Sequence, residues 1–114
     1  MSVHCMTLNS PWYELVKSGE KTLEGRRWTD KTASIKVGDT IQISHHVNKT
    51  LPSFNKTVTN IFKFQTFEHG LTQPTFLTRA LPTIPTIEEG VEIYKKYVSL
   101  QTQLKDGICF IELE

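Results

Sequence analysis

Residues 18–30, SGEKTLEGRRWTD, concentrate opposite charges beside an aromatic residue and indicate a strand with one polar face. Four charged residues fall within the seven positions from 21 to 27, and a tryptophan follows them: Lys21, Glu24, Arg26, Arg27 and Trp28. In a regular strand alternate side chains share a face, so Glu24 and Arg26 are expected to be neighbours. Leu23 alternates with them and indicates that the opposite face meets the core. The stretch therefore predicts a strand that presents a carboxylate and a guanidinium together.

The pairing of Glu24 with Arg26 is typical of two different structures. A carboxylate beside a guanidinium stays ionised and holds the guanidinium in place. Arg26 held in this way could bind a phosphate or a base edge through paired hydrogen bonds, and Gly25 would leave room for a ligand or another backbone to approach. The alternative is a structural ion pair that fixes the strand to its neighbour in the sheet. The charge pattern alone leaves both interpretations open.

Lys21 and Trp28, at the two ends of the charged stretch, are further candidates for a site. Lys21 opens the predicted strand on the face opposite to Glu24, but a bulge would bring it to the same face. If Lys21 is buried near Arg26, its pKa would fall and it could act as a base or nucleophile. If it is exposed, it could contact a phosphate or remain an ordinary surface lysine. Aromatic residues that could stack on nucleic-acid bases are Trp12, Trp28, Tyr94 and Tyr97, and Trp28, beside the charged motif, is the better candidate.

The composition predicts one globular domain over residues 1–114 without a strong overall field, because the 114 residues carry a net charge of only +1. Binding to nucleic acid would therefore come from a local patch. Such a patch suits a nucleotide or a short RNA better than a long duplex. The sequence lacks cysteine and histidine spacings typical of metal ligands, so we expect neither a metal site nor another cofactor.

The two cysteines and the N-terminal sequence suggest an intracellular protein, cytoplasmic or nuclear. Cys5 and Cys109 lie in apolar, strand-like segments and are expected to be reduced and to pack in the interior. The first ten residues do not have the pattern of a secretory signal, and no apolar run approaches 18 residues. We therefore expect no membrane partner, and we expect a monomer.

Hydrophobic periodicity predicts about five strands and two main helices. The predicted strands are 3–8, 21–28, 35–47 with a turn at Gly38-Asp39, 57–67 and 107–114. The predicted helical segments are 11–19, short turns in 66–71 and 74–81, and 86–98. Segments 29–34 and 48–56 are expected to be loops. In the two main helices, Trp12 and Tyr94 lie on apolar stripes and are expected in the core.

Two of the predicted strands carry apolar residues on both faces. In 57–67, Val58, Phe62 and Phe64 are expected on one face and Ile61 on the other. In 107–114, both alternating sets are apolar, so this strand is expected to be central or to lie inside a closed sheet. Strands of this kind with few helices favour an α+β fold, a small mixed β-barrel of about five to six strands flanked by helices.

Six sequence blocks, in this order and spacing, make the chain similar to the ASCH domain family, named for activating signal cointegrator homology, within the PUA-like superfamily. The blocks are HCMTL, PWYELVKSG, KTLEGR, KVGDTI, TIEEGVEIYKKY and DGICFIEL. The resemblance implies a PUA-like β-barrel whose ends are covered by helices. It also implies a cleft around the second strand, where the lysine, glutamate and arginine of KTLEGR lie.

The resemblance implies several activities. PUA-like domains commonly bind RNA, and ASCH domains have been interpreted as RNA-binding or coactivator-linked modules. A few small stand-alone members resemble hydrolases, either ribonucleases or amidohydrolases that remove acetyl groups from acetylcytidine. In the amidohydrolase type the lysine of the motif is catalytic, and a threonine follows it by three positions. Lys21 matches this lysine and Arg26 the motif arginine, but Glu24 occupies the threonine position, so the chain departs from that mechanism.

Three functions are therefore compared. The first is a module that binds RNA or a modified nucleotide through Lys21, Glu24, Arg26, Arg27 and Trp28. The second is a small hydrolase acting on RNA or a modified nucleoside, with Lys21 and Glu24 as an acid/base pair. The third is a protein-interaction domain in which the charged strand is structural.

Overall fold

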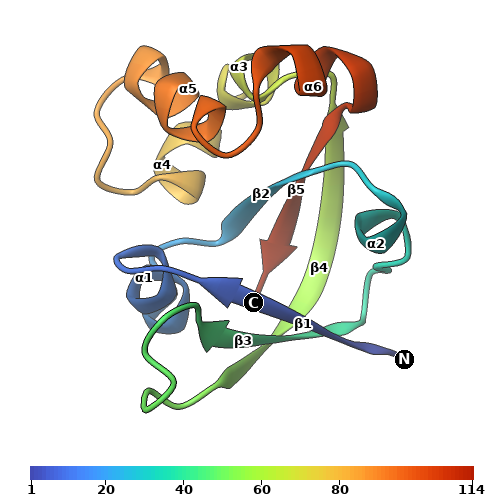
Figure 1. Cartoon of the computed structure of the whole chain (residues 1–114), viewed down its shortest axis with the longest axis vertical. Coiled ribbons are helices and arrows are strands. Elements are labelled where there is room, and N and C mark those ends of the chain that lie inside the picture. Colours follow the sequence, from blue (N-terminus) through green and yellow to red (C-terminus); the bar gives the residue numbers. More distant parts are fainter.

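The computed structural model describes all residues 1–114 and confirms an α+β fold with five strands and six helices (Figure 1). The strands are β1 (Val3–Leu8), β2 (Leu23–Arg27), β3 (Thr40–His45), β4 (Phe54–Phe64) and β5 (Ile108–Leu113). The helices are α1 (Trp12–Ser18), α2 (Asp30–Ala33), α3 (Phe67–Leu71), α4 (Phe76–Ala80), α5 (Ile87–Lys95) and α6 (Leu100–Asp106). In Figure 1, α3 to α6 gather at one end of the sheet, whereas α1 and α2 lie on opposite sides of it.

The strands form one curled sheet in the order β1-β3-β4-β5-β2, in which only the β1–β3 pair is parallel. This order makes β1 and β2 the two edge strands, which are not paired with each other. Side chains connect β1 to β2 and to the helix after it. Arg26 Nη2 of β2 donates to the Thr7 carbonyl oxygen at 3.3 Å, and Lys31 Nζ of α2 donates to that of Cys5 at 3.1 Å. We call this junction between β1 and β2 the seam.

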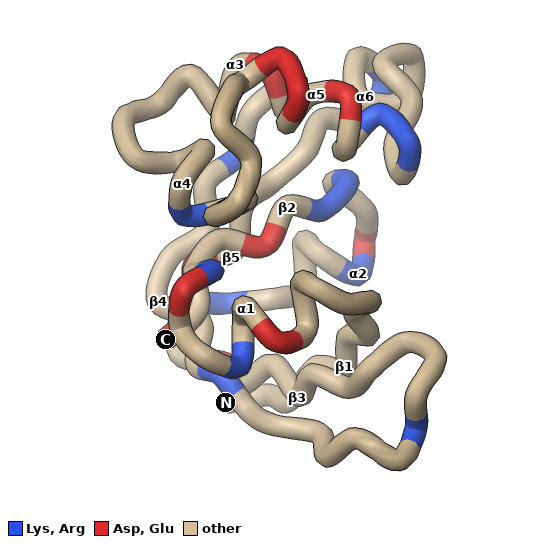
Figure 2. Tube along the Cα trace, turned by 90° about the vertical axis from the view of Figure 1, so that its left-hand side faces the viewer, with Lys and Arg blue, Asp and Glu red and all other residues tan.

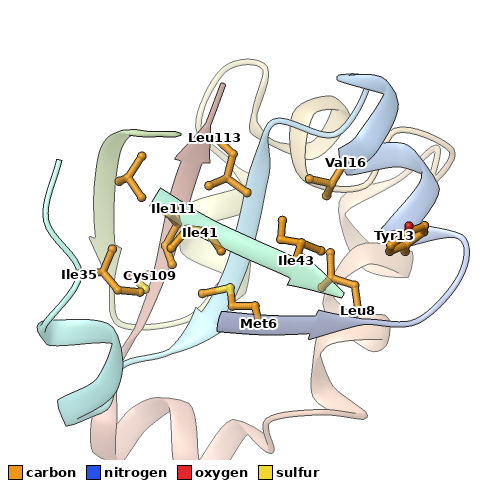
Figure 3. Close-up of a cluster of buried hydrophobic side chains, with 11 residues drawn as sticks. Met6, Leu8, Tyr13, Val16, Ile35, Ile41, Ile43, Cys109, Ile111 and Leu113 are labelled. Atoms are coloured by element: carbon orange, nitrogen blue, oxygen red, sulfur yellow. The ribbon is translucent and has the colours of Figure 1, made fainter. Parts of the chain in front are cut away.

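Two hydrophobic clusters lie on the two faces of β5, as expected for a central strand. Figure 3 shows the barrel core, which includes Cys109, Ile111 and Leu113 of β5 together with side chains from β1, β3 and α1. The helical core lies on the other face and includes Ile108 and Phe110 with residues of α3, α4 and α5. Alternate side chains of β5 therefore pack into the barrel core and into the helical core, so this strand connects the two.

A β-bulge in β4 changes which face its apolar residues occupy. The pairing with β5 shifts between Val58 and Asn60, so one extra residue lies in β4. Val58 and Ile61 consequently both contact the barrel core, whereas Phe62 and Phe64 contact the helical core. The prediction that Val58 shares a face with the two phenylalanines was wrong for this reason. The strand also begins at Phe54, within the segment expected to be a loop, and ends at Phe64.

Capping residues in the sequence mark the end of α1 and the start of α5. Gly19, at φ 89°, ends α1, and the Thr86 hydroxyl accepts a hydrogen bond from the Glu89 N–H at the start of α5. Two helices were not predicted. Helix α2 forms in the expected loop 29–34, and α6 forms in a segment without an apolar stripe. None of the helices combines the length and the apolar character needed to cross a membrane.

The two cysteines occupy different environments. Cys109 is fully buried in β5, and burial raises the pKa of its thiol to about 12. Cys5 is exposed on β1, so the prediction that it packs in the interior was wrong. The alternation of β1 explains the difference, because Met6 and Leu8 occupy its inward face and Cys5 points outward.

Candidate functional site

A cavity of about 460 Å³ lies along the seam and beneath the helical end of the molecule, and we call it the main cleft. Its walls come from the end of β1, the start of α1, strand β2 with the residues before it, and the C-terminal part of α5. The lining residues are Thr7, Leu8, Asn9, Trp12, Lys21, Glu24, Gly25, Arg26, Arg27, His46, Phe67, Leu81, Ile93, Tyr94, Tyr97 and Val98. Lys21, Glu24, Arg26 and Arg27 therefore do meet in one cavity.

Lys21 is buried at the inner side of the main cleft. Strand β2 begins only at Leu23, so no bulge is involved, and Lys21 reaches Glu24 from the segment that precedes the strand. Its Nζ lies 3.3 Å from Glu24 Oε1 and donates to the carbonyl oxygens of Leu23, at 2.7 Å, and Ala80. Burial lowers the pKa of Lys21, and the Glu24 carboxylate partly opposes this effect. These three acceptors match the three protons of an ammonium group.

Glu24 and Arg26 are neighbours on one face of β2, as the alternation predicts. Arg26 Nε donates to Glu24 Oε2 at 2.9 Å, while the other oxygen of Glu24 faces Lys21. The Glu24 side chain is 9% exposed and that of Arg26 33%, so the charged groups run from the interior to the mouth of the cleft. Arg26 Nη2 bonds the Thr7 carbonyl, which leaves further N–H groups of the guanidinium for a ligand.

Tyr94 brings a buried hydroxyl to the main cleft. Its ring stacks on Phe67 at a centroid distance of 4.0 Å, and its hydroxyl oxygen is buried without a hydrogen-bond partner in the protein. Burial, and then the Glu24 carboxylate, raise the pKa of Tyr94 well above its ordinary value, so the hydroxyl stays neutral. A neutral hydroxyl can both donate and accept. Tyr94 is thus a core residue, as expected, and also a cleft residue.

Gly25 has a different role from the expected one. A Cβ atom at this position would lie 2.8 Å from ring carbons of both Phe67 and Tyr94. The absence of a side chain at Gly25 therefore admits these two aromatic rings to the surface of β2, rather than leaving open space for a ligand.

The other predicted site residues differ in their positions. Arg27 lines the cleft with a half-exposed side chain, and its Nε lies 3.8 Å from Asp106 Oδ2. Trp28 is not among the lining residues; it packs against the barrel core, and Lys63 Nζ lies 4.0 Å from the centre of its ring. Its position therefore gives no support to the prediction that Trp28 stacks on a ligand.

The cleft is also lined by Trp12 and Tyr97, two of the candidates for base stacking, and by His46, which was expected to be structural. Trp12 was expected in the core, but it is half-buried and lines the cleft, with its ring 5.6 Å from Lys21 Nζ. Exposed Tyr97 lies just beyond α5, and His46 follows β3 and contacts Thr7 Oγ1 at 3.2 Å. Their only shared signal is aromatic or polar character near the end of an element. No group of three or more histidine, cysteine or acidic side chains could hold a metal ion.

Comparisons with known proteins agree with this architecture. The chain is similar to the crystal structure of hypothetical protein PH0355, with a TM-score of 0.84 and 29% identity, over 100% of this chain and 98% of that one. It is also similar to the solution NMR structure of protein PF0455 from Pyrococcus furiosus, with a TM-score of 0.77 and 28% identity, over 98% and 96% of the two chains. No curated protein sequence matches it. Residues 6–106 match the model of the ASCH domain, and the chain therefore belongs to the ASCH domain family, which is generally linked to RNA binding.

Proposed function

We propose that the main cleft binds one nucleotide-sized unit, either a free nucleotide or a single residue of a short RNA. The observation that carries this proposal is the convergence of the Lys21–Glu24–Arg26 chain and the unpartnered Tyr94 hydroxyl in one cleft. A volume of about 460 Å³ falls within the range of small-molecule sites, which is roughly 300–1,000 Å³. A cleft of this size suits one base better than an extended duplex.

The inner side of the cleft has the chemistry to recognise a base edge. Glu24 still has lone pairs that can accept an N–H group, and the Tyr94 hydroxyl can donate to a ring nitrogen or a carbonyl. Both groups are nearly buried, so a ligand that left them unpaired would bind less well. Lys21 donates to three protein acceptors already, and its role in binding is therefore to hold Glu24 in position.

The outer side of the cleft suits the flat face and the charged part of a nucleotide. Trp12 and exposed Tyr97 line it and are available for stacking. Arg26 and Arg27 stand at its mouth, where free guanidinium N–H groups can bind a phosphate. These contacts are local, which fits a chain with a net charge of +1.

Two pairs of variants test this proposal by calorimetry with nucleosides, mononucleotides and short single-stranded RNAs. Arg26→Ala should weaken binding about tenfold or more. The matched control is Arg79→Ala, because Arg79 has a similar exposure, 30%, and also pairs with a carboxylate, but lines neither described cavity. Equal effects of the two variants, or no binding by the wild-type chain, would contradict the proposal.

The second pair isolates the Tyr94 hydroxyl. Tyr94→Phe should weaken binding while leaving the free energy of unfolding unchanged or raising it, because the lost hydroxyl has no protein partner. In the control Tyr13→Phe, the lost hydroxyl donates to the Pro52 carbonyl, so stability should fall by about 1 kcal/mol and binding should be retained. If Tyr94→Phe binds every ligand as the wild type does, base recognition by Tyr94 is wrong.

A hydrolase is the second candidate, and the buried Lys21–Glu24 pair is the observation that favours it. A lowered pKa makes Lys21 a better base or nucleophile, and Glu24 could exchange a proton with it. Each ligand that binds should be incubated with the wild type and with Lys21→Ala, and the products identified by mass spectrometry. Turnover by the wild type alone, with folding of the variant verified by circular dichroism, would establish the hydrolase. Binding of a ligand without formation of products would favour the binding module over the hydrolase.

A further inference from the structure

A second, smaller cavity of about 190 Å³ adjoins the main cleft at the α2 end of the seam. Its lining residues come from β1, the end of β2 and α2: Met6, Arg26, Arg27, Thr29, Lys31 and Thr32. Arg26 and Arg27 line both cavities, so the two are neighbours across these side chains. Figure 2 shows basic positions at the end of β2 and on α2, along the same part of the chain.

Three of the six lining residues are cations and none is a carboxylate. Lys31 Nζ donates to the neutral carbonyl of Cys5, which leaves two of its protons free. Glu24 holds Arg26 only through Nε, on the side of the main cleft, and Asp106 lies 3.8 Å from Arg27 Nε. The lining of the second cavity therefore carries three cations and no carboxylate, and it has unused N–H donors.

The walls of this cavity are held in place before any ligand binds. Thr32 is buried, and its hydroxyl oxygen accepts from the Thr29 N–H at 2.7 Å. Its hydroxyl proton faces two carbonyl oxygens, that of Thr29 at 3.0 Å and that of Arg27 at 3.2 Å. The Thr29 hydroxyl accepts from the Thr32 N–H and keeps its own proton, whose nearest acceptor is Thr32 Oγ1 at 3.4 Å. Helix α2 is thus fixed to the end of β2, and Lys31 is fixed across the seam to β1. Donors positioned in this way bind an anion with little loss of entropy.

We propose that the second cavity is an anion subsite that binds the phosphate next to the base in the main cleft. This inference rests on the proposed function and deepens it, because it assigns the ligand class. The protein then binds phosphorylated nucleotides or RNA residues in preference to free nucleosides. Arg26 and Arg27 lie between the two subsites and can contact both parts of the ligand. Lys31 and the Thr29 hydroxyl line only the second cavity and therefore contact only the phosphate.

The test is calorimetry of the full chain with a nucleoside and with its 5′- and 3′-monophosphates. For the wild type, one of the two monophosphates should bind about tenfold more tightly than the nucleoside. This ratio should fall to about one- to threefold in Lys31→Ala, while the affinity for the nucleoside stays unchanged. The matched control is Lys36→Ala, because Lys36 is also an exposed lysine whose Nζ donates to a single carbonyl, but it lines neither cavity.

The outcomes separate the subsite from the function on which it rests. If nucleoside and monophosphates bind the wild type equally, the subsite is wrong and the base-binding cleft stands. The same follows if Lys31→Ala retains the wild-type ratio, or if it weakens both ligands equally and lowers the melting temperature, which would make Lys31 a structural link of the seam. If neither nucleoside nor monophosphate binds, the proposed function fails, and the subsite fails with it.

Discussion

The two sides of the sheet satisfy their backbone groups in different ways. Where β5 pairs with β4 and β2, the strands bond to each other, and apolar side chains cover both faces. At the seam, the carbonyl groups of Cys5 and Thr7 on β1 are bonded by the side chains of Lys31 and Arg26. Cationic side chains at an edge protect it from pairing with another strand. The same side chains line the two cavities, so the candidate site lies where strand pairing ends.

The largest effect is expected on the paired side, from Phe110→Ala in β5. Phe110 is fully buried and makes edge-to-face contacts with Phe67, Phe76 and Tyr94. Loss of this ring should lower the free energy of unfolding by about 3–5 kcal/mol in urea titrations. A loss below about 1 kcal/mol would mean that the helical core does not depend on this strand, contrary to our description.

Glu24→Gln tests the buried charges of the seam and should have the second largest effect. The change leaves the Lys21 ammonium buried without its carboxylate, and stability should fall by about 2–3 kcal/mol. The direction in which the stability contribution of Lys21 changes with pH tests this coupling between Lys21 and Glu24. The pKa of folded Lys21 lies below its ordinary value of 10.5, so the unfolded chain binds more protons and this group adds stability as pH rises toward 10.5.

Without Glu24 the charged form of Lys21 is less favoured still, so the gain with pH should be larger in Glu24→Gln. The difference in unfolding free energy between wild type and variant should therefore shrink as pH rises toward 10.5. A difference that stays constant over this range would show that Lys21 and Glu24 are not coupled.

Asp39→Asn examines the far end of the β1–β3 pair, in the turn before β3. Hydrogen bonds from His4, then from the N–H groups of Lys36 and Ser2, lower the pKa of Asp39 from 3.8 to about 2. Because this pKa is lowered on folding, the contribution of Asp39 is present above its unfolded pKa and is lost as pH falls toward 2. In thermal unfolding from pH 6 to pH 2, the melting temperatures of the wild type and of Asp39→Asn should approach each other as the pH falls. A difference in melting temperature that stays constant over this range would contradict the hydrogen-bond network around Asp39.

The smallest effect is expected from Arg79→Ala, on the paired side. Arg79 pairs with Glu112 on β5, and both side chains are partly exposed. Its loss should reduce stability by about 0.2–1 kcal/mol. Arg26→Ala at the seam should cost more, about 1–2 kcal/mol, because it removes a partner of nearly buried Glu24. Urea titrations of both variants compare the two sides directly, and the reverse order of costs would contradict the comparison.

The parts of the fold that depend on local alternation were predictable from sequence. The two apolar faces of residues 108–113 predicted an interior strand, and β5 lies between β4 and β2. The spacing of Glu24 and Arg26 predicted that they are side by side. Both conclusions require only that the segment is a strand. The prediction for β4 failed because a bulge of one residue reverses the faces beyond it, and the sequence around Thr59 carries no glycine to indicate a bulge.

The cleft itself depends on contacts between distant segments, and these were not predictable. The position of Lys21 depends on the residue at which β2 begins, and its acceptors include Ala80 on another element. Thr7 reaches the cleft from β1, which pairs with β3, and Tyr97 reaches it from the segment after α5, whose residues Ile93 and Tyr94 also line the cleft. Helix α2 has four residues and is stabilised by the Thr29 and Thr32 hydroxyls rather than by an apolar stripe, so its periodicity gave no signal.

The most direct test of the seam as a nucleotide site is chemical-shift mapping of the backbone amides of the ¹⁵N-labelled full chain during titration with a mononucleotide. Our account predicts saturable shifts at Thr7, Asn9, Gly25, Arg26 and Tyr97, all of which line the main cleft. Amides of the β3–β4 surface, such as Asn55 and Thr57, should not move. Shifts confined to that surface, or no shifts at saturating ligand for any of the common mononucleotides, would contradict the account.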